Sequence, residues 1–441
     1  MQKPVLDSGP REVDNETGGP PSAEGGVGAS DASGAATGRR RADGVRTLFG
    51  MRDFRNYWYG SAVFGIGIWA FLTAMGWTAL ELTDSAFAVS LTNVVYFLPM
   101  FVFALPAGVL ADVWDRRWTA IVVRAGGGLV AVALALLAGT AALSFTWLLV
   151  LSFLVGLSVI GELASRQAYI AQIVTPDRLT NATALTSFQG GVARVVGPLM
   201  AGWFIDRFGD SGGYAMFAVS NLLFVVFFLR IRTPGTAPTR ERRRMRTELV
   251  DGLGYLRRHR DAATIVMMSV FTGTVGWVYL ALMPVMARDV LDGDAVVLGS
   301  LSMAVGLGSI PGALLLSLRN RVAGEGRIYI ASLLVWGAGI IVFGASRSLP
   351  LSLIALFVGG VGFGMQTILS RTLLLRIVDA AYHGRVLGLL MLTWGANIVG
   401  TLTAGSLADL LSVSVVIGAS GTLVVILTIG LVAGNRRVAE L

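Results

Sequence analysis

The sequence predicts an all-α membrane protein whose twelve transmembrane helices form two six-helix bundles. Of its 441 residues, 54% are hydrophobic and 14% are charged, whereas about a quarter of a soluble domain is charged. Apolar stretches of about 20 residues, the length that a helix needs to cross a hydrocarbon core, follow one another along the chain. The second half of the chain also repeats motifs of the first. These observations argue against a water-soluble enzyme.

The N-terminal segment, residues 1–45, is rich in Gly, Ser, Ala, Pro, Asp and Glu and ends in Arg39, Arg40 and Arg41. It has too few large apolar side chains to offset the entropy of ordering, so we expect a disordered cytoplasmic tail. The segment has no signal-peptide pattern, and the first apolar stretch is therefore expected to act as an uncleaved targeting helix.

Twelve apolar stretches follow this tail. The expected helices cover residues 57–80, 86–111, 118–140, 146–172, 181–206, 213–231, 262–287, 296–318, 327–345, 350–376, 384–409 and 413–433. The interruption from Arg288 to Asp294 is acidic and argues for two spans rather than one between residues 262 and 318.

The placement of arginines predicts the orientation of these helices. With the N-terminus inside, the external loops hold Arg207, Arg288 and Arg347. The internal loops hold Arg116, Arg117, Arg178, the run from Arg230 to Arg260, Arg319, Arg321, Arg327, Arg385, Arg436 and Arg437. Lys and Arg favour the cytoplasmic side, so both termini are expected in the cytoplasm. The strong preference for arginine over lysine indicates a GC-rich genome, hence a bacterial inner (plasma) membrane.

The predicted domains are a bundle over residues 46–231, a basic linker over 232–260, a second bundle over 261–437 and a short cytoplasmic C-terminus over 438–441. The linker carries Arg240, Arg242, Arg243, Arg244 and Arg246, followed at helical spacing by Leu249, Leu253 and Leu256. We expect an interfacial helix whose arginines face anionic lipid headgroups, with a specific protein partner as the alternative.

Composition also limits the chemistry. The chain has no cysteine and two histidines, His259 and His383, which argues against disulfides, metal sites and cofactor chemistry. We therefore expect no catalytic residue, no metal and no cofactor. The net charge of +8 comes from arginines beside apolar spans, so it predicts contact with the lipid bilayer and not with nucleic acid.

An internal repeat relates the two halves at an offset of 203 to 204 residues. The segment from Gly197 to Asp206 matches the segment from Gly400 to Asp409 at five of ten positions. A parallel repeat of this kind is typical of transporters whose substrate site lies between the halves near the bilayer midplane.

A motif between the second and third spans carries the first family resemblance. It comprises Gly108, Asp112, Asp115, Arg116 and Arg117, and it resembles the cytoplasmic loop signature of the major facilitator superfamily, with Val113 where an arginine is usual. Gly108 permits close helix approach, and Asp112 can face the positive end of a helix from the other half and stabilise a closed cytoplasmic gate. The alternative is that the two arginines serve only as topology anchors.

Further motifs extend this resemblance over nearly the whole of residues 54–437. They are Phe54 to Gly60, Arg166 to Ala168, Pro176 to Ala182 and Ala193 to Pro198, and as an ordered set they resemble the enterobactin-exporter-like and macrolide-efflux-like branch. That resemblance implies export of a medium-sized organic molecule, usually driven by proton entry.

Gly197, Pro198 and Gly202 also resemble the antiporter motif of drug-proton exchangers, with Ala201 in place of one glycine. A proline and small residues inside a span permit a bend and close packing, and packing alone is the alternative reading.

Glu162 and Arg194 are charged residues inside predicted spans, where ionisable groups are costly and usually functional. Helical rise places them roughly 15 and 20 Å from the inner ends of their helices, so their depths are compatible. The repeat aligns Gln366 with Glu162 and Asn397 with Arg194. We hypothesise that Glu162 titrates and that Arg194 is its countercharge or contacts an anionic substrate. A fixed pair of Glu162 with Arg194, or with Arg166 one turn away, is the alternative.

Aromatic and amide side chains supply candidates for an amphipathic cavity. We expect Tyr96, Gln189, Gln366, Trp394 and Asn397 to line it. The sequence thus predicts a secondary transporter that exports a small siderophore-like or drug-like molecule by alternating access in exchange for protons, functions as a monomer and is not an enzyme. A transporter of lysophospholipid or another lipid-like molecule, and a transport-inactive sensor or scaffold, are the alternatives.

Overall fold

Long helices account for nearly all of the chain that the structure, a computed structural model, describes. It describes residues 46–441 apart from 114, 236–244, 318–323 and 391. Within this range the side chains of 104–113, 163–164, 168, 245–250, 317, 381, 387 and 392–394 are also left out. The predicted tail and Arg240 to Arg244 of the predicted linker therefore lie outside the described residues. All contacts below lie within Leu48–Leu441.

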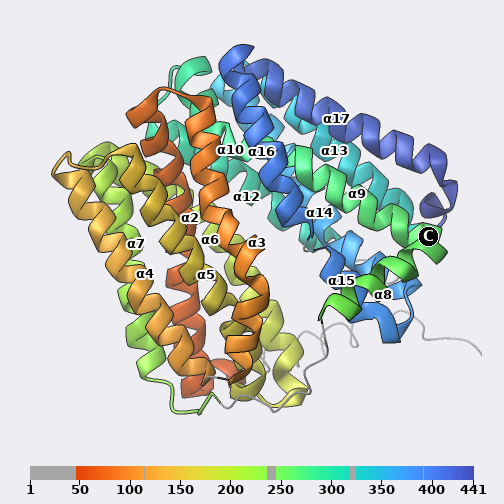
Figure 1. The fold of residues 1–441 in the computed structure, drawn as a ribbon, viewed down its shortest axis with the longest axis horizontal. Coiled ribbons are helices and arrows are strands. Elements are labelled where there is room, and N and C mark those ends of the chain that lie inside the picture. Colours follow the sequence, from red (N-terminus) through yellow and green to blue (C-terminus); the bar gives the residue numbers. More distant parts are fainter. Residues whose placement is uncertain (1–45, 114, 236–244, 318–323, 391) are drawn as a thin grey trace, which may run out of the picture. The chain divides into compact units, whose positions relative to one another are not determined.

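The first half contains six long helices (Figure 1). They are α2 (Arg52–Thr83), α3 (Ala86–Val113), α4 (Arg116–Gly139), α5 (Phe145–Ile173), α6 (Leu179–Phe208) and α7 (Asp210–Leu229). Side chains fix several of their starts, because the first backbone N–H groups of a helix need acceptors. Asp115 accepts from the backbone N–H of Trp118 at 2.9 Å, and Ser144 caps α5. Gly209 takes a φ of +66° in the turn between α6 and α7, which favours glycine.

The second half begins after the linker helix α8 (Met245–Arg258). Its elements are α9 (Arg260–Gly276), α10 (Val278–Ala281), α11 (Met283–Val285), a π turn (Met286–Val290), α12 (Ala295–Ser317), α13 (Glu325–Ala345), α14 (Leu349–Ile377), α15 (His383–Leu389), α16 (Leu392–Leu410) and α17 (Val413–Gly434). Each of the twelve predicted spans thus corresponds to helix. The seventh is interrupted near Pro284, which has no N–H to continue the ladder, and the eleventh is divided between α15 and α16.

Ten helical segments of the described chain are long and apolar enough to cross a membrane. Of the twelve predicted spans, α6 and α16 are the two outside this set. Helix α6 lies between neighbours from the two halves, so it needs a less apolar surface than a helix that faces lipid.

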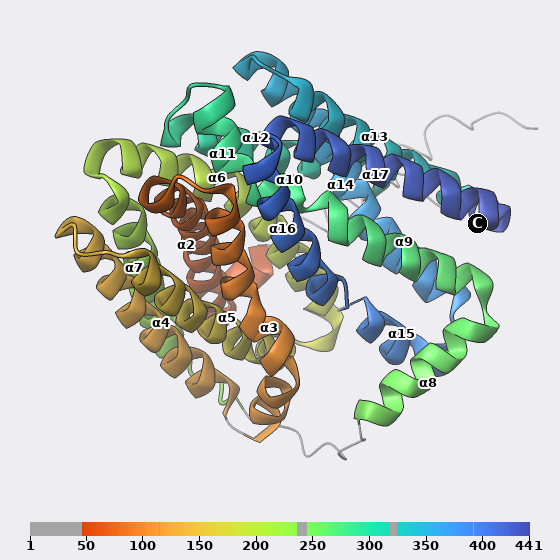
Figure 2. The ribbon, with the colours of Figure 1, turned by 45° about the horizontal axis from the view of Figure 1, so that its top comes forward.

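The predicted repeat is confirmed by the way the helices pack. In the first half α4 packs on α5 and α7, α2 on α6 and α7, and α3 on α5. The equivalent helices pair in the same way in the second half: α13 packs on α14 and α17, α9 on α16 and α17, and α12 on α14. The halves meet where α3 packs on α16 and α6 on α12, and Figure 2 shows the first of these pairs side by side.

The linker is attached to both halves. Asp53 at the start of α2 accepts hydrogen bonds from the backbone of Arg232 at 3.2 Å and of Thr233 at 2.9 Å. The linker contains a helix, α8, which packs on α15; its interfacial position stays a prediction. Its Tyr255 lies over Tyr382 with ring centroids 4.6 Å apart, and Leu256 is buried while Leu253 is 48% exposed. We call the end of the bundle next to this linker the linker end, and the opposite end the far end.

Candidate functional site

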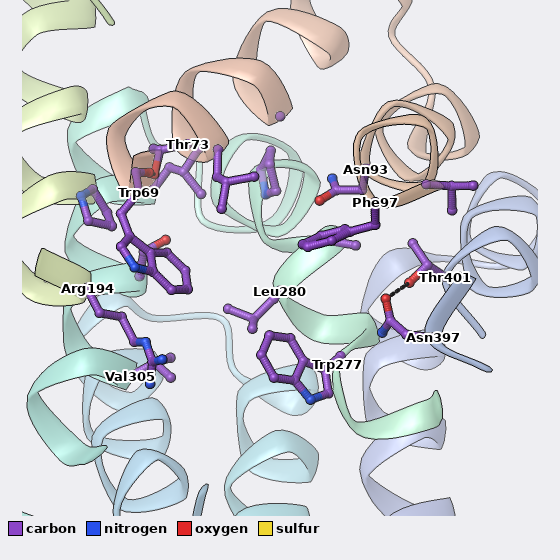
Figure 3. Close-up of a pocket in the computed structure, with 18 of the residues that line it drawn as sticks. Trp69, Thr73, Asn93, Phe97, Arg194, Trp277, Leu280, Val305, Asn397 and Thr401 are labelled. Carbon is purple, nitrogen blue, oxygen red and sulfur yellow. Dashed lines mark hydrogen bonds between the residues drawn. The ribbon is translucent and has the colours of Figure 1, made fainter. Parts of the chain in front are cut away.

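Two adjoining cavities lie between the halves. The smaller has a volume of about 100 Å³ and is lined by residues of α2, α3, α6, α10 to α12, α14 and α16, together with Trp277 between α9 and α10 (Figure 3). The larger has a volume of about 900 Å³ and extends from these residues toward the linker end, to Ala184 of α6 and Arg371 of α14. Arg194, Trp277, Phe363 and Asn397 line both cavities. The larger cavity is open to its surroundings, since Phe188 in its wall is 58% exposed.

Arg194 is the charged group at the junction of the two cavities. Its guanidinium lies 5.1 Å from the ring centre of Trp69 and 5.6 Å from that of Phe363. These distances are typical of cation–π contacts. Its Nε atom is buried and has no hydrogen-bond partner among the described residues. Figure 3 shows the side chain beside Trp69, facing Leu280 and Trp277 across the cavity.

The cavity lining is positively charged. Among the described residues that line either cavity, the charged ones are Arg194 and Arg371, and no carboxylate is included. Around these cations the wall alternates aromatic rings with hydroxyl and amide groups. Such a surface can bind an anionic organic molecule, because the arginines supply charge and paired donors while the rings supply apolar contact.

Helices from the two halves are held together at the far end. The Asp409 carboxylate on α16 accepts hydrogen bonds from the Ser85 hydroxyl at 2.7 Å and from the backbone N–H groups of Ala86 at 2.7 Å and Phe87 at 3.2 Å. It thus caps α3 from the opposite half, where a negative charge is favoured by the helix dipole. Arg288 forms an ion pair with Asp84 across the same boundary.

Glycines allow the close helix approach at this end. A Cβ atom on Gly202 would collide with the backbone carbonyl of Ala295 and lie 3.0 Å from the Cα atom of Val296. At the repeat-related position, a Cβ atom on Gly405 would collide with Ser90 on α3. The repeat therefore places one glycine at each of the two far-end contacts between halves. Gly197 and Gly400 instead allow close packing within each half, against α2 and α9 respectively.

The predicted gate motif bonds to its own half and to the start of the linker. The second carboxylate oxygen of Asp115 accepts from the Gly235 backbone N–H at 3.1 Å. Arg117 donates to the carbonyls of Phe228 at 3.1 Å and Leu229 at 2.9 Å, at the C-terminus of α7. Arg116 is buried and bonds Gly235 through its backbone. The Asp112 side chain and the surroundings of Gly108 lie outside the described part of the chain, so the gating role of Asp112 stays a prediction.

Glu162 lies in the interior of the first half and is 1% exposed. It forms an ion pair and hydrogen bond with Arg166, one turn further along α5. Tyr57 donates to the Arg166 carbonyl at 3.2 Å. The buried Arg124 on α4 also interacts electrostatically with Glu162, and it donates to Ser158 at 3.3 Å. The structure therefore brings Glu162 together with Arg166, the alternative partner that the sequence left open, and places Arg194 separately on the cavity.

Comparison with known proteins identifies the chain. Residues 47–440 match the family described as transmembrane secretion effectors. The chain belongs to this family of major facilitator superfamily transporters. The transporter is 21% identical over 352 residues to the staphyloferrin A transporter of Staphylococcus aureus (strain NCTC 8325 / PS 47), covering 79% of this chain and 87% of that protein. This membership confirms the predicted superfamily and the prediction that the protein is not an enzyme.

Solved structures confirm the fold of the transporter. A nucleoside transporter matches with a TM-score of 0.71 at 13% identity, over 86% of this chain and 98% of that one. A bacterial homologue of the human lysosomal transporter Spinster, inward-facing and occupied, matches with a TM-score of 0.67 at 14% identity, over 86% and 96%. A D-xylose-proton symporter matches with a TM-score of 0.66 at 14% identity, over 86% and 97%.

The predicted cavity residues of the transporter divide into three groups. Gln366 and Asn397 line the larger cavity, and Asn397 also lines the smaller one. Tyr96 and Gln189 are buried and outside the lining of both cavities. The side chain of Trp394 lies outside the described residues.

Sequence reasoning missed Phe363 and Arg371, although a signal was present. Together with Gln366, Thr367 and Ser370, they follow the spacing i, i+3, i+4, i+7 and i+8 that marks one face of a helix, and all five line the larger cavity.

We predict that replacing Gly202 by Leu prevents closure of the far end of the transporter. The added side chain collides with the α12 backbone, which cannot rotate away. Because the chain has no cysteine, a single Leu280→Cys reporter in the smaller cavity can be labelled selectively. A membrane-impermeant maleimide added on the far-end side should label this reporter at least fivefold faster in the Gly202→Leu background.

Gly418→Leu on α17 is the matched control, since a Cβ atom there meets nothing within 4 Å. Equal labelling in the Gly202→Leu and Gly418→Leu backgrounds would show that the α6–α12 contact does not control access.

Proposed function

We propose that the transporter exports an anionic, partly apolar organic molecule by alternating access, in exchange for protons. The observation that carries this proposal is Arg194, a cation between two aromatic rings whose buried Nε lacks a partner among the described residues. A buried cation is costly unless it is paired. An anionic substrate would supply the missing partner, and its apolar part would lie against Trp69, Trp277 and Phe363.

The family description as secretion effectors supports export, and the proposed topology agrees with it. The arginine bias assigns the linker end to the cytoplasm, so the larger cavity receives substrate from inside the cell. The far-end contacts of Asp409 and Arg288 would close the outer side in this conformation, and outward release requires them to separate. The similarity to the staphyloferrin A transporter supports a siderophore-like substrate. Both termini would be cytoplasmic, in a bacterial plasma membrane.

We propose Glu162 as the proton-binding group. It is a carboxylate within a described span, is nearly inaccessible to solvent and is held by Arg166. Protonation removes its charge and weakens the pair, which frees Arg166 and alters the packing of α5 against α2 and α4. A proton bound at this position can thereby bias the arrangement of the first half without entering the substrate cavity.

Two aromatic dyes of opposite charge test the proposal directly. Everted membrane vesicles that contain the transporter and are acidified inside should take up Lucifer yellow, a dianion, and lose part of their pH gradient. Ethidium, an aromatic cation, should be taken up at no more than a tenth of that rate, because it meets Arg194. Vesicles without the transporter provide the background rate.

Preferential uptake of ethidium would overturn the anionic substrate class. Uptake of Lucifer yellow with no change in the gradient would overturn proton exchange. Binding of the dye by the purified protein without uptake would instead identify a sensor that retained the transporter fold.

A further inference from the structure

Arg371 is a second cation in the larger cavity, and it lies closer to the linker end than Arg194. The Arg194 guanidinium lies over Phe363, which is on α14, the helix that also carries Arg371. The eight residues from Phe363 to Arg371 correspond to about 12 Å along the helix at 1.5 Å per residue. The two cations therefore lie at different depths of one continuous cavity.

The surroundings of Arg371 differ from those of the other arginine near this end of α14. Arg376 is bound by Glu325, with an N–O distance of 3.0 Å. Arg371 is exposed and lines the cavity beside Gln366, Thr367 and Ser370. The described lining contains no carboxylate that could neutralise it. Arg371 is thus available to a ligand in the same volume as Arg194.

We propose that the substrate carries at least two anionic groups at opposite ends, one bound by Arg194 and the other by Arg371. This inference rests on the proposed function and narrows the substrate class from an anion to an elongated dianion. A cavity of about 900 Å³ is within the range of sites that hold drug-sized molecules. Its aromatic and hydroxyl side chains between the two cations contact the middle of such a molecule.

The two arginines have different tasks in this arrangement. Arg194 lies at the junction with the smaller cavity, contacts both halves of the protein and binds the leading anionic group. Arg371 lies on α14 of the second half. It binds the other anionic group, which lies nearer the linker end. A molecule with one anionic group takes the Arg194 position, where the cation is less hydrated, and leaves Arg371 in water.

A rigid pair of probes tests this assignment by isothermal titration calorimetry on the purified transporter. Biphenyl-4,4′-dicarboxylate carries two anionic groups, and biphenyl-4-carboxylate carries one on the same scaffold. In the wild type the dianion should bind at least tenfold more tightly. Arg371→Gln should remove this advantage and leave the affinity for the monoanion within twofold, whereas Arg194→Gln should weaken both probes.

Arg347→Gln is the matched control, because Arg347 is exposed at the far-end start of α14, outside the cavity lining. Equal affinity of the wild type for the two probes, or equal effects of Arg371→Gln on both, would overturn the two-anion inference and leave the Arg194 site standing. The proposed anion site itself would be overturned if Arg194→Gln bound both probes with wild-type affinity, or if the wild type bound neither probe. Melting temperatures no lower than that of the wild type show that each variant is folded.

Discussion

Replacing Arg194 by Gln is expected to reduce Lucifer yellow uptake by about 10- to 100-fold and to leave the protein at least as stable as the wild type. A hydrogen bond to a charged group contributes about 1.5–3 kcal/mol, and 1.4 kcal/mol is tenfold in affinity. The same substitution removes a partly buried cation whose Nε has no described partner, so the melting temperature should stay constant or rise.

The combination of lost transport and retained stability distinguishes a ligand-binding arginine from a structural one. Arg194→Lys keeps the charge but loses the planar guanidinium group and much of its stacking on the aromatic rings. We therefore expect an uptake rate between those of the wild type and Arg194→Gln. Arg347→Gln should transport normally. Arg194 would have a structural role in packing if Arg194→Gln lowered the melting temperature and reduced transport only in proportion to the loss of folded protein.

Replacing Glu162 by Gln is expected to abolish the substrate-dependent loss of the pH gradient. The amide is close in shape to the carboxylic acid but cannot exchange a proton. The variant also leaves Arg166 and Arg124 without their carboxylate in the interior of the first half. Removing one partner of a buried pair costs about 3–5 kcal/mol, so we expect a lower melting temperature as well.

A double variant separates the coupling role of Glu162 from its structural role. Glu162→Gln combined with Arg166→Met removes both charges of the pair, so it should recover most of the lost stability. If Glu162 carries the proton, the double variant transports substrate down its gradient without moving protons. Recovery of proton-coupled uptake along with stability would restrict Glu162 to a structural ion pair.

The number and order of the helices were predictable from the sequence. Hydrophobic length identifies spans, and a repeat of five matching positions in ten is enough to relate two bundles. The breaks at Pro284 and between α15 and α16 were not predicted, because hydropathy averages over a whole span and does not register local backbone geometry.

The directions in which the candidate site residues point were not predictable from the sequence. Helical rise placed Glu162 and Arg194 at compatible levels, yet it does not determine which way each helix turns its side chains. That choice depends on packing: Glu162 is buried in the first half and paired with Arg166, whereas Arg194 lies against Trp69 and Phe363 on the cavity.

The repeat predicted which positions in the two halves correspond, but it did not predict which residues those positions contact. It aligned Asp206 with Asp409 and Gly202 with Gly405, but a sequence match does not reveal that Asp409 caps α3 of the other half. It also aligned Glu162 with Gln366, and of these two only Gln366 is in the described cavity lining. Two equivalent helices can thus carry different functions at matching positions.

Simultaneous recording of dye and proton movement in one preparation is the most direct test of anion–proton exchange through the Arg194 cavity. Proteoliposomes acidified inside would receive Lucifer yellow, with wild-type transporter and Arg194→Gln compared at equal protein content. The account predicts that dye uptake and proton release start together in the wild type and that both are lost in Arg194→Gln. Proton release that persists in Arg194→Gln, or dye uptake that proceeds in the wild type without proton release, would contradict it.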